Sequence, residues 1–223
     1  SAGATVSGEA TTFPLPASEK DLIENWQKFT GPLELTNKYP SEYEPASTSA
    51  PAKNVPEPPT QVPTRTHPTF EGAYETLRAY YSALISARKD GRYASQAQSF
   101  IHPQDYTLLE EVGDFKELYN QGGWYTDFIC SISMEQKEPT AALKGDDGYL
   151  AIYLRSHYSA TSIRQPDGTE RNIPEATQAA LSHPMLFTQG RWWVISNDYL
   201  AQRLNTPGSS AKASALFQDS GVI

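Results

Sequence analysis

The chain has few of the residues that mark disulfide, metal or cofactor chemistry. Its 223 residues include one cysteine and four histidines. The single cysteine, Cys130, excludes an internal disulfide and lies in an apolar run, so we interpret it as a core thiol. The histidines lack the short spacings of a metal site. We therefore expect neither a metal nor a cofactor.

Long apolar segments and basic stripes are also missing. No apolar run approaches the roughly 20 residues of a membrane-spanning helix. The formal net charge is −8, and the chain has no Lys/Arg stripe of the kind that a nucleic-acid surface needs, which predicts no nucleic-acid partner. Phosphate-loop, nucleophile-elbow and EF-hand motifs are missing as well, so the sequence offers no catalytic residues to predict.

Proline, in contrast, is concentrated at one end of the chain. Eleven of the 17 prolines fall in the first 68 residues. The stretch 46–66 is rich in Pro, Ser, Thr and Ala and offers only Val55 and Val62 for burial, which predicts an extended, mobile linker. We therefore divide the chain into a Pro/Ser/Thr-rich leader, one folded domain and a C-terminal tail, over residues 1–66, 67–200 and 201–223.

One segment of the leader has helical periodicity. Apolar residues at three- and four-residue steps, closed by Gly31-Pro32, predict a short amphipathic helix near residues 18–30. Its Trp26 and Phe29 would be costly to leave in water. We therefore expect this helix to dock either on the domain or on a membrane-protein partner.

The domain begins with three predicted helices. Thr69 is the expected N-cap of the first, which ends before Gly91 and carries apolar residues at helical spacing. Two shorter helices are expected over residues 93–100 and 104–119. After Gly122-Gly123 the hydrophobic period changes from 3.6 to 2. Strands are therefore predicted over residues 124–135, 149–163, 176–189 and 192–196.

The first two strands predict a long hairpin. Pairing Leu143 with Tyr149 places the even-numbered residues of both strands on one apolar face and the odd-numbered residues on a wetter face. In this register Glu135 lies opposite His157 as a surface ion pair. On the apolar face, the hydroxyl of Tyr158 is the one polar group between the helices and the sheet.

Four motifs carry a resemblance to a known fold. They are Thr69-Phe70-Glu71-Gly72-Ala73, Tyr80-Tyr81, Gly122-Gly123 and Gly190-Arg191-Trp192-Trp193-Val194. With three helices before a long antiparallel sheet, the region from Thr69 to Asp198 resembles the nuclear-transport-factor-2-like (SnoaL-like) superfamily, and more narrowly an uncharacterised family of actinobacterial lipoproteins. The resemblance implies an α+β cone fold, in which three N-terminal helices pack on a strongly curved antiparallel sheet.

The resemblance to lipoproteins also implies a cellular location. The chain opens on Ser1-Ala2-Gly3-Ala4-Thr5 without an initiator Met, which is typical of a mature or trimmed chain. By the resemblance, a lipidated cysteine would precede Ser1 after removal of a signal peptide, and the leader would be a spacer from the membrane. We therefore expect an extracytoplasmic domain of the cell envelope, anchored by lipid to the cell membrane.

Enzymes of this superfamily place an Asp or His base inside the cone beside a Tyr or a second acid. The predicted register puts Asp127 and His157 on the outer face, while His102 and His183 precede prolines and are interpreted as turn residues. We therefore predict a non-enzymatic domain that binds a small apolar ligand or a protein partner. The candidate lining of the cone consists of Tyr81, Phe128, Cys130, Ile132, Leu154, Tyr158 and Trp193.

Two alternatives stay open. The first is an isomerase or dehydratase of the same fold, which needs an ionisable group on the even-numbered face, where Tyr158 and Cys130 are the visible ones. The second is an accessory subunit of a membrane complex, for which a docked leader helix and exposed aromatic rings are the hints. In the pairs Tyr80-Tyr81 and Trp192-Trp193, we expect one ring of each to be buried and one exposed.

Overall fold

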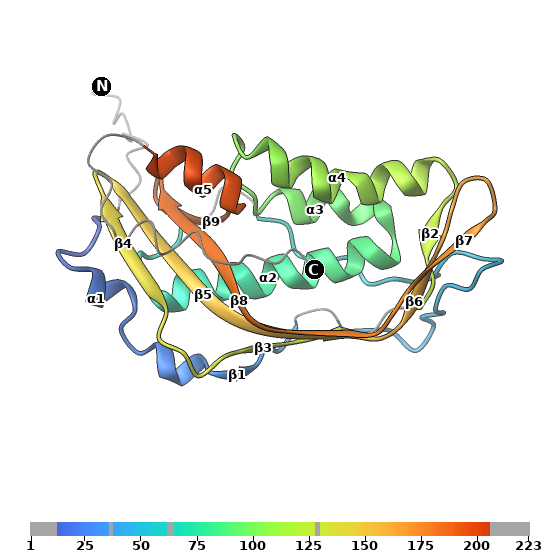
Figure 1. The fold of residues 1–223 in the computed structure, drawn as a ribbon, viewed down its shortest axis with the longest axis horizontal. Coiled ribbons are helices and arrows are strands. Elements are labelled where there is room, and N and C mark those ends of the chain that lie inside the picture. The colour runs from blue at the N-terminus through green and yellow to red at the C-terminus, as the bar shows by residue number, and fades with distance from the viewer. Residues whose placement is uncertain (1–12, 36–37, 62–64, 128–129, 206–223) are drawn as a thin grey trace, which may run out of the picture.

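The fold combines α-helices with antiparallel β-sheet, in a computed structural model that describes residues 13–35, 38–61, 65–127 and 130–205 (Figure 1). The predicted α+β class is confirmed. No helix in these ranges is both long and apolar enough to cross a membrane. The helical elements are α1 (Glu19–Leu22), η1 (Trp26–Phe29), α2 (Phe70–Lys89), η2 (Gly91–Tyr93), α3 (Ala94–Gln98), α4 (Tyr106–Asn120) and α5 (Asn197–Leu204).

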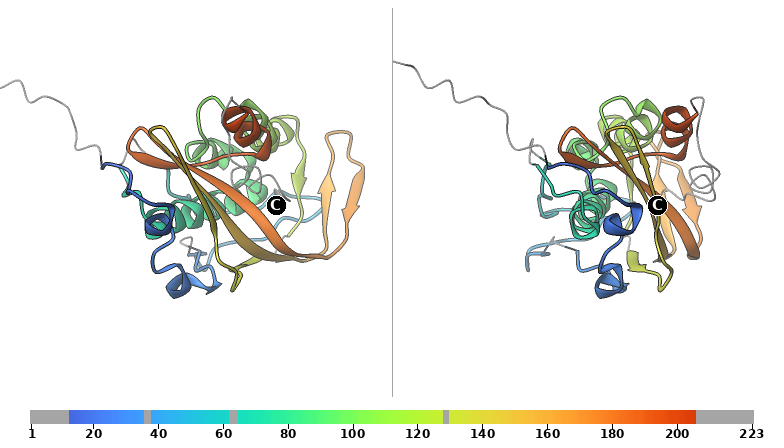
Figure 2. Two further views of the ribbon diagram at one scale, coloured as in Figure 1. Left: turned by 60° about the vertical axis from the view of Figure 1, so that its left-hand side comes forward. Right: turned by 90° about the vertical axis from the view of Figure 1, so that its left-hand side faces the viewer.

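The strands of the described ranges form two antiparallel sheets. In the larger sheet the order is β1-β3-β5-β8-β9, with β4 also paired to β5, and in the smaller sheet it is β2-β6-β7. The long ribbon of β5 and β8 bends and continues at its far end as β6 and β7 (Figures 1 and 2). The strands are β1 (Gly31–Pro32), β2 (Trp124–Tyr125), β3 (Cys130–Met134), β4 (Thr140–Lys144), β5 (Asp147–Tyr158), β6 (Thr161–Arg164), β7 (Glu170–Ile173), β8 (Ala176–Thr188) and β9 (Arg191–Val194).

Helix α2 has the bounds that its sequence predicts. Its N-cap Thr69 accepts a hydrogen bond from the Gly72 backbone N–H at 3.2 Å, which satisfies one of the free donors of the first turn. Both Tyr80 and Tyr81 are buried, so the expectation of one exposed ring was wrong. The reason is that α2 contacts the sheet on one side and α3, α4 and the leader on others, which leaves little of its surface to water.

The predicted hairpin is divided into two registers. β4 pairs with β5 so that Leu143 lies opposite Gly148, one residue from the predicted partner Tyr149. β3 pairs with the second half of β5 and places Cys130 opposite Tyr158. The two strands are separate because residues 135–139 include Pro139, which has no N–H to donate to a ladder.

The predicted division of faces is confirmed for the residues that contact the helices. Ile132 and Met134 of β3 and Leu154 of β5 are buried in one core cluster with the apolar residues of α2. The predicted ion pair between Glu135 and His157 was wrong, because the register of β3 is shifted by four residues along β5. Glu135 pairs instead with Arg155, with 3.2 Å between Oε1 and Nε.

The other face of β5 has its own core, which the sequence did not predict. Odd-numbered Tyr149 and Ala151 are fully buried because α5 lies over them. The predicted tail over residues 201–223 therefore begins too early, since α5 continues to Leu204 and residues 206–223 lie outside the described residues. This second core consists of Ala142, Tyr149, Ala151, Leu186, Trp193, Ile195, Tyr199, Leu200 and Leu204.

The Pro-rich leader packs on the domain, contrary to the expectation of a mobile linker over residues 46–66. The carbonyl of Ala46 accepts from the Asp127 N–H at 3.1 Å, and the carbonyl of Pro56 accepts from the Ser86 hydroxyl at 3.2 Å. This segment has few apolar side chains, but its backbone carbonyls accept hydrogen bonds from the domain. A prediction from composition considers side chains alone and omits these backbone hydrogen bonds. Val55 is also buried, whereas Val62 lies outside the described residues.

The aromatic residues of the leader contact the domain as well. The predicted helix near residues 18–30 is two short turns, α1 and η1. The Phe29 ring lies 5.6 Å from that of Phe70 and 4.9 Å from that of Tyr74, and Trp26 packs against the same core. Figure 2 shows these blue elements beside α2. Docking on the domain, one of the two expected outcomes, is therefore the one observed.

A lysine at the end of α2 contacts residues in the middle of the leader. Lys89 is buried, and its ammonium lies 3.1 Å from the Tyr43 hydroxyl and 3.5 Å from the Asp127 carboxylate. The same ammonium lies 5.4 and 5.3 Å from the ring centroids of Tyr39 and Tyr43, within cation–π range. Burial lowers the pKa of Lys89, and the Asp127 charge opposes that shift. The leader and domain therefore share one polar cluster.

A buried carboxylate joins α4 to α5. Asp105 is 1% exposed and caps α4 by accepting from the Leu108 N–H at 3.2 Å. It also accepts from the Ser196 hydroxyl at 2.8 Å and the Ser196 N–H at 2.6 Å. Because Ser196 is itself the N-cap of α5, one carboxylate orients the first turns of both helices.

We expect Leu77→Ala to lower the free energy of unfolding by about 2 to 5 kcal/mol, because the side chain is fully buried at the centre of α2. Glu75→Ala is the matched control. Its carboxylate is half-exposed and pairs only with Arg78, which predicts a loss of about 0 to 1 kcal/mol. Urea unfolding measures both values, and equal losses would contradict the orientation of α2 described here.

We expect Asp105→Ala to lower the free energy of unfolding by about 2 to 3 kcal/mol, because three charge-assisted hydrogen bonds are lost in a buried site. Hydrogen exchange should show earlier opening of α5 than of α2 in this variant. Asp198→Ala, which removes an exposed carboxylate from the first turn of α5, serves as the control. Unchanged protection of α5 in Asp105→Ala would contradict the joint capping.

Candidate functional site

Five of the seven predicted lining residues meet in the main core. Tyr81, Ile132 and Leu154 are 3% exposed or less, and Cys130 and Tyr158 pack against the same cluster. Burial raises the pKa of the Cys130 thiol to about 11, so the thiol stays protonated near neutral pH, as expected of a core cysteine. These side chains fill the space between helices and sheet with one another.

The remaining two residues do not join this group. Trp193 lies opposite Leu186 on β8 and belongs to the second core under α5, on the other face of the sheet. Phe128 lies outside the described residues. Trp192 and Trp193 are both buried, one in each core, so the expectation of an exposed ring was wrong here too. The reason is that α5 covers the face that the sequence assigned to solvent.

One histidine that the sequence assigned to a turn lies in the main core. His183 belongs to β8, lies opposite Ile152 and is 6% exposed. Its Nδ1 is 2.9 Å from the Tyr81 hydroxyl, and its Nε2 has no hydrogen-bond partner among the described residues. Burial lowers the pKa of His183 to about 4 and raises that of Tyr81. The pair is therefore neutral at pH 7 and enclosed by core side chains.

A sequence signal for His183 existed. It follows Leu181 and precedes Met185 at the two-residue steps of a strand, and all three face the helices. The prediction of a turn at His183 relied on the proline that follows it and disregarded this alternation. Pro184 is accommodated within β8 opposite Ala151, so the strand continues through it.

The two residues predicted to lie on the outer face are both exposed, His157 on β5 and Asp127 between β2 and β3. His157 is exposed, with Nε2 3.1 Å from the Glu175 carboxylate and Nδ1 2.7 Å from the Thr177 hydroxyl. The Asp127 side chain is half-exposed and pairs with Lys89. Neither residue approaches the Tyr81–His183 pair as a second acid or base.

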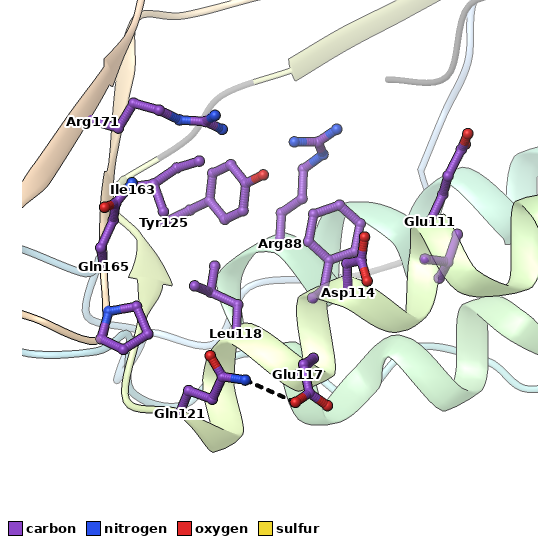
Figure 3. A pocket seen from close by; sticks show the side chains of 13 residues that line it. Arg88, Glu111, Asp114, Glu117, Leu118, Gln121, Tyr125, Ile163, Gln165 and Arg171 are labelled. Carbon is purple, nitrogen blue, oxygen red and sulfur yellow. Dashed lines mark hydrogen bonds between the residues drawn. The ribbon is translucent and has the colours of Figure 1, made fainter.

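An open groove lies at the far end of the molecule, between α4 and the smaller sheet (Figure 3). We call it the α4–β6 groove, and its volume is about 700 Å³. None of the six predicted lining residues that the structure describes contributes to it. It is lined by Arg88 from α2, by Tyr125, Ile163 and Arg171 from the smaller sheet, by Gln165 and Pro166 from the β6–β7 turn, and by Glu111, Val112, Asp114, Phe115, Glu117, Leu118 and Gln121 from α4 and its end.

The double glycine after α4 allows the smaller sheet to lie close to the end of this helix. Gly122 has φ +85°, and the Gly123 N–H donates to the Leu118 carbonyl at 2.8 Å. A Cβ at Gly123 would lie 2.7 Å from the Arg164 carbonyl oxygen, so only glycine allows the chain to pass this close to β6. The turn brings Tyr125 beside Phe115, with ring centroids 5.7 Å apart.

The walls of the groove differ in charge. The Arg88 guanidinium lies 4.9 Å from the Phe115 ring centroid and 5.3 Å from that of Tyr125, while Arg171 lines the opposite side from β7. The acidic residues all come from α4. Burial raises the pKa of Glu111, and the Glu117 carboxylate accepts from Gln121 at 2.8 Å. The groove thus combines aromatic and aliphatic surface with a basic and an acidic rim.

Sequence reasoning missed this groove because its residues come from five separate elements. The available signals were the Gly122-Gly123 turn and the helical spacing of Phe115 and Leu118 on one face of α4. Neither indicates that Arg88 and Arg171, 83 residues apart, line the same pocket.

Comparison with known proteins gives one family. A family of unknown function (DUF6318) matches residues 41–198. Neither the curated proteins nor the solved structures gave a match. The matched region begins inside the predicted leader, and it includes the segment around Ala46 and Val55 that packs on the domain.

The buried His183 predicts a pH-dependent stability. Its folded pKa of about 4 is below the unfolded value of 6.5, so the unfolded chain binds a proton first as the pH falls. Stability is then greatest above about pH 6.5 and decreases towards pH 4. We expect His183 to account for a loss of about 2 kcal/mol between pH 7 and pH 5.

Urea unfolding at pH 7 and pH 5 measures this difference. His183→Phe, which keeps a buried ring without a titrating nitrogen, should show a difference between the two pH values that is about 2 kcal/mol smaller than in the unmodified chain. His157→Ala, which removes an exposed ring, is the control. A His183→Phe variant with the same pH dependence as the unmodified chain would contradict the burial of this imidazole.

Proposed function

Since the chain belongs to DUF6318, a family of unknown function, we propose from its geometry that it is a non-enzymatic binding module whose ligand site is the α4–β6 groove. Of the two predicted kinds of binding, to a small apolar ligand or to a protein partner, the proposal keeps the first. It moves the site from the space between α2 and the larger sheet to the far end of the molecule.

The observation that carries the proposal is the open groove with an apolar and aromatic wall, which lies outside the closely packed main core. Its volume of about 700 Å³ falls in the range of roughly 300 to 1,000 Å³ that small-molecule sites occupy. Phe115, Leu118 and Ile163 supply apolar surface, and Tyr125 supplies a ring with a hydroxyl. Aromatic and aliphatic walls with a few polar groups are typical of ligand sites.

The enzyme alternative has less support. The Tyr81–His183 pair is the arrangement nearest to a general base beside a tyrosine, but the histidine is enclosed and neither residue lines the α4–β6 groove. A general base needs hydrogen-bond reach to a substrate proton. The pair is better explained as a buried hydrogen bond between α2 and β8.

The finer fold and the cellular address are also proposals. Helices before a bent antiparallel sheet support a fold of the nuclear-transport-factor-2-like type, with α2, α3 and α4 as its three helices. The address, an extracytoplasmic and lipid-anchored protein, is supported by the resemblance of the motifs between Thr69 and Val194 to the lipoprotein family. The accessory-subunit alternative has less support, because Trp26 and Phe29 already pack on the domain's own core.

Binding of a neutral fluorescent probe, N-phenyl-1-naphthylamine, tests the proposed site. We expect its fluorescence to rise on binding to the full chain, and Leu118→Gln to weaken binding about tenfold, because an amide replaces part of the apolar wall. Leu109→Gln is the matched control, since Leu109 is also a partly buried leucine of α4 but lies outside the groove. Absence of binding, or equal weakening by the two substitutions, would contradict the proposed function.

A further inference from the structure

Two arginines from distant parts of the chain line the same groove. Arg88 is in the last turn of α2, and Arg171 is on β7 at the edge of the smaller sheet. Figure 3 shows their guanidinium groups entering from different sides, with the Tyr125 hydroxyl directed into the space between them. The groove therefore has a basic end that also offers a hydroxyl.

The surroundings of Arg88 suit it to binding a ligand group. It is partly buried, and its guanidinium lies over two aromatic rings, which orients the planar fork and separates it from bulk water. Attraction between charges is stronger in such an environment than at an open surface.

Arg171 supplies the second charge. Its side chain is exposed and makes no hydrogen bond or ion pair with any residue that the structure describes, although its backbone pairs with Ile163 of β6. The neighbouring Arg164 differs, because it donates to the Gly122 carbonyl at 2.6 Å and lies over the Trp124 ring. Arg171 is thus the arginine of the smaller sheet whose donors remain for a ligand.

The acidic residues restrict the kind of ligand. Glu111, Asp114 and Glu117 all belong to α4, so negative charge lies along the helix side of the groove and positive charge at the end formed by α2 and β7. A polyanion that covered the whole groove would meet both signs. A ligand with one anionic end and an uncharged body meets only the basic end and the apolar wall.

We propose that the α4–β6 groove binds a single-chain amphiphile, whose anionic head group is held by Arg88 and Arg171 and whose apolar chain lies along Phe115, Leu118 and Ile163. This inference rests on the proposed function and adds the chemical class of the ligand. Carboxylate and phosphate oxygens both match the paired donors of a guanidinium, so the shared chemistry is a terminal oxyanion on an aliphatic chain.

Displacement of N-phenyl-1-naphthylamine from the full chain tests the head group. The competitors are laurate, dodecyl phosphate and dodecyltrimethylammonium, which share one chain length, each below its micellar concentration. We expect at least one of the two anions to displace the probe at a tenfold lower concentration than the cation. Comparison of laurate with dodecyl phosphate distinguishes a carboxylate from a phosphate ligand.

Arg171→Gln is the diagnostic variant, because the side chain is exposed and its replacement removes no side-chain hydrogen bond or ion pair to the described residues. With the probe affinity of each variant measured first, the ratio of anion to cation affinity should fall about tenfold. Arg155→Gln, which removes an exposed arginine from β5 outside the groove, should keep that ratio.

The outcomes separate this inference from the proposed function. If the probe binds but the three competitors displace it equally, or if Arg171→Gln keeps the ratio of the unmodified chain, the head-group inference is overturned and the groove remains a ligand site. Preferential displacement by the cation would assign the head group to the acidic side of α4 and would also overturn the inference. If the probe does not bind, the proposed function itself is contradicted.

Discussion

The pairing of β5 with β8 is the contact on which both cores depend. It runs from Gly148 opposite Phe187 to Tyr158 opposite Ala176, and each half of the ribbon has a different environment. Near β9 the ribbon is covered on both faces, by α2 on one and by α5 on the other. Its strands there are apolar at successive positions, because neither face is left to water. The ribbon is therefore the element that joins α2 to α5, which lie on opposite faces of it.

The ribbon of β5 and β8 also determines where the α4–β6 groove lies. Its register shifts between Leu154 and Ser156, and Ala180 on the facing strand has φ +54°, so the ribbon bends before it continues as β6 and β7. The bend brings the smaller sheet up to the end of α4, where the Gly122-Gly123 turn allows the close approach to β6. The groove therefore depends both on the adjacent Gly122-Gly123 turn and on a bend in β5 and β8 that involves residues outside it.

The leader belongs to this architecture. Its backbone carbonyls and Tyr43 bind donors on α2, on Tyr93 and on Asp127, and the family match begins at residue 41, within it. Apart from the Glu44–Lys53 bridge, the carbonyls of this Pro-rich segment are left for donors on the folded surface, because proline has no N–H with which to continue a ladder. The module that folds together therefore starts well before the capped first turn of α2.

The sequence by itself determined α2 with its Thr69 cap, the change of period after Gly122, the turn that leads into β5, and the assignment of even-numbered residues of β3 and β5 to the main core. These features depend on neighbours within a few residues, where capping, turn chemistry and alternation are decisive. Only the tertiary structure decided which odd-numbered residues are buried under α5, that His183 is hydrogen-bonded to Tyr81, and that Arg88 and Arg171 line one groove. The physical reason is that burial of a side chain and the meeting of two charges depend on what packs across from them, and those partners lie dozens of residues away along the chain.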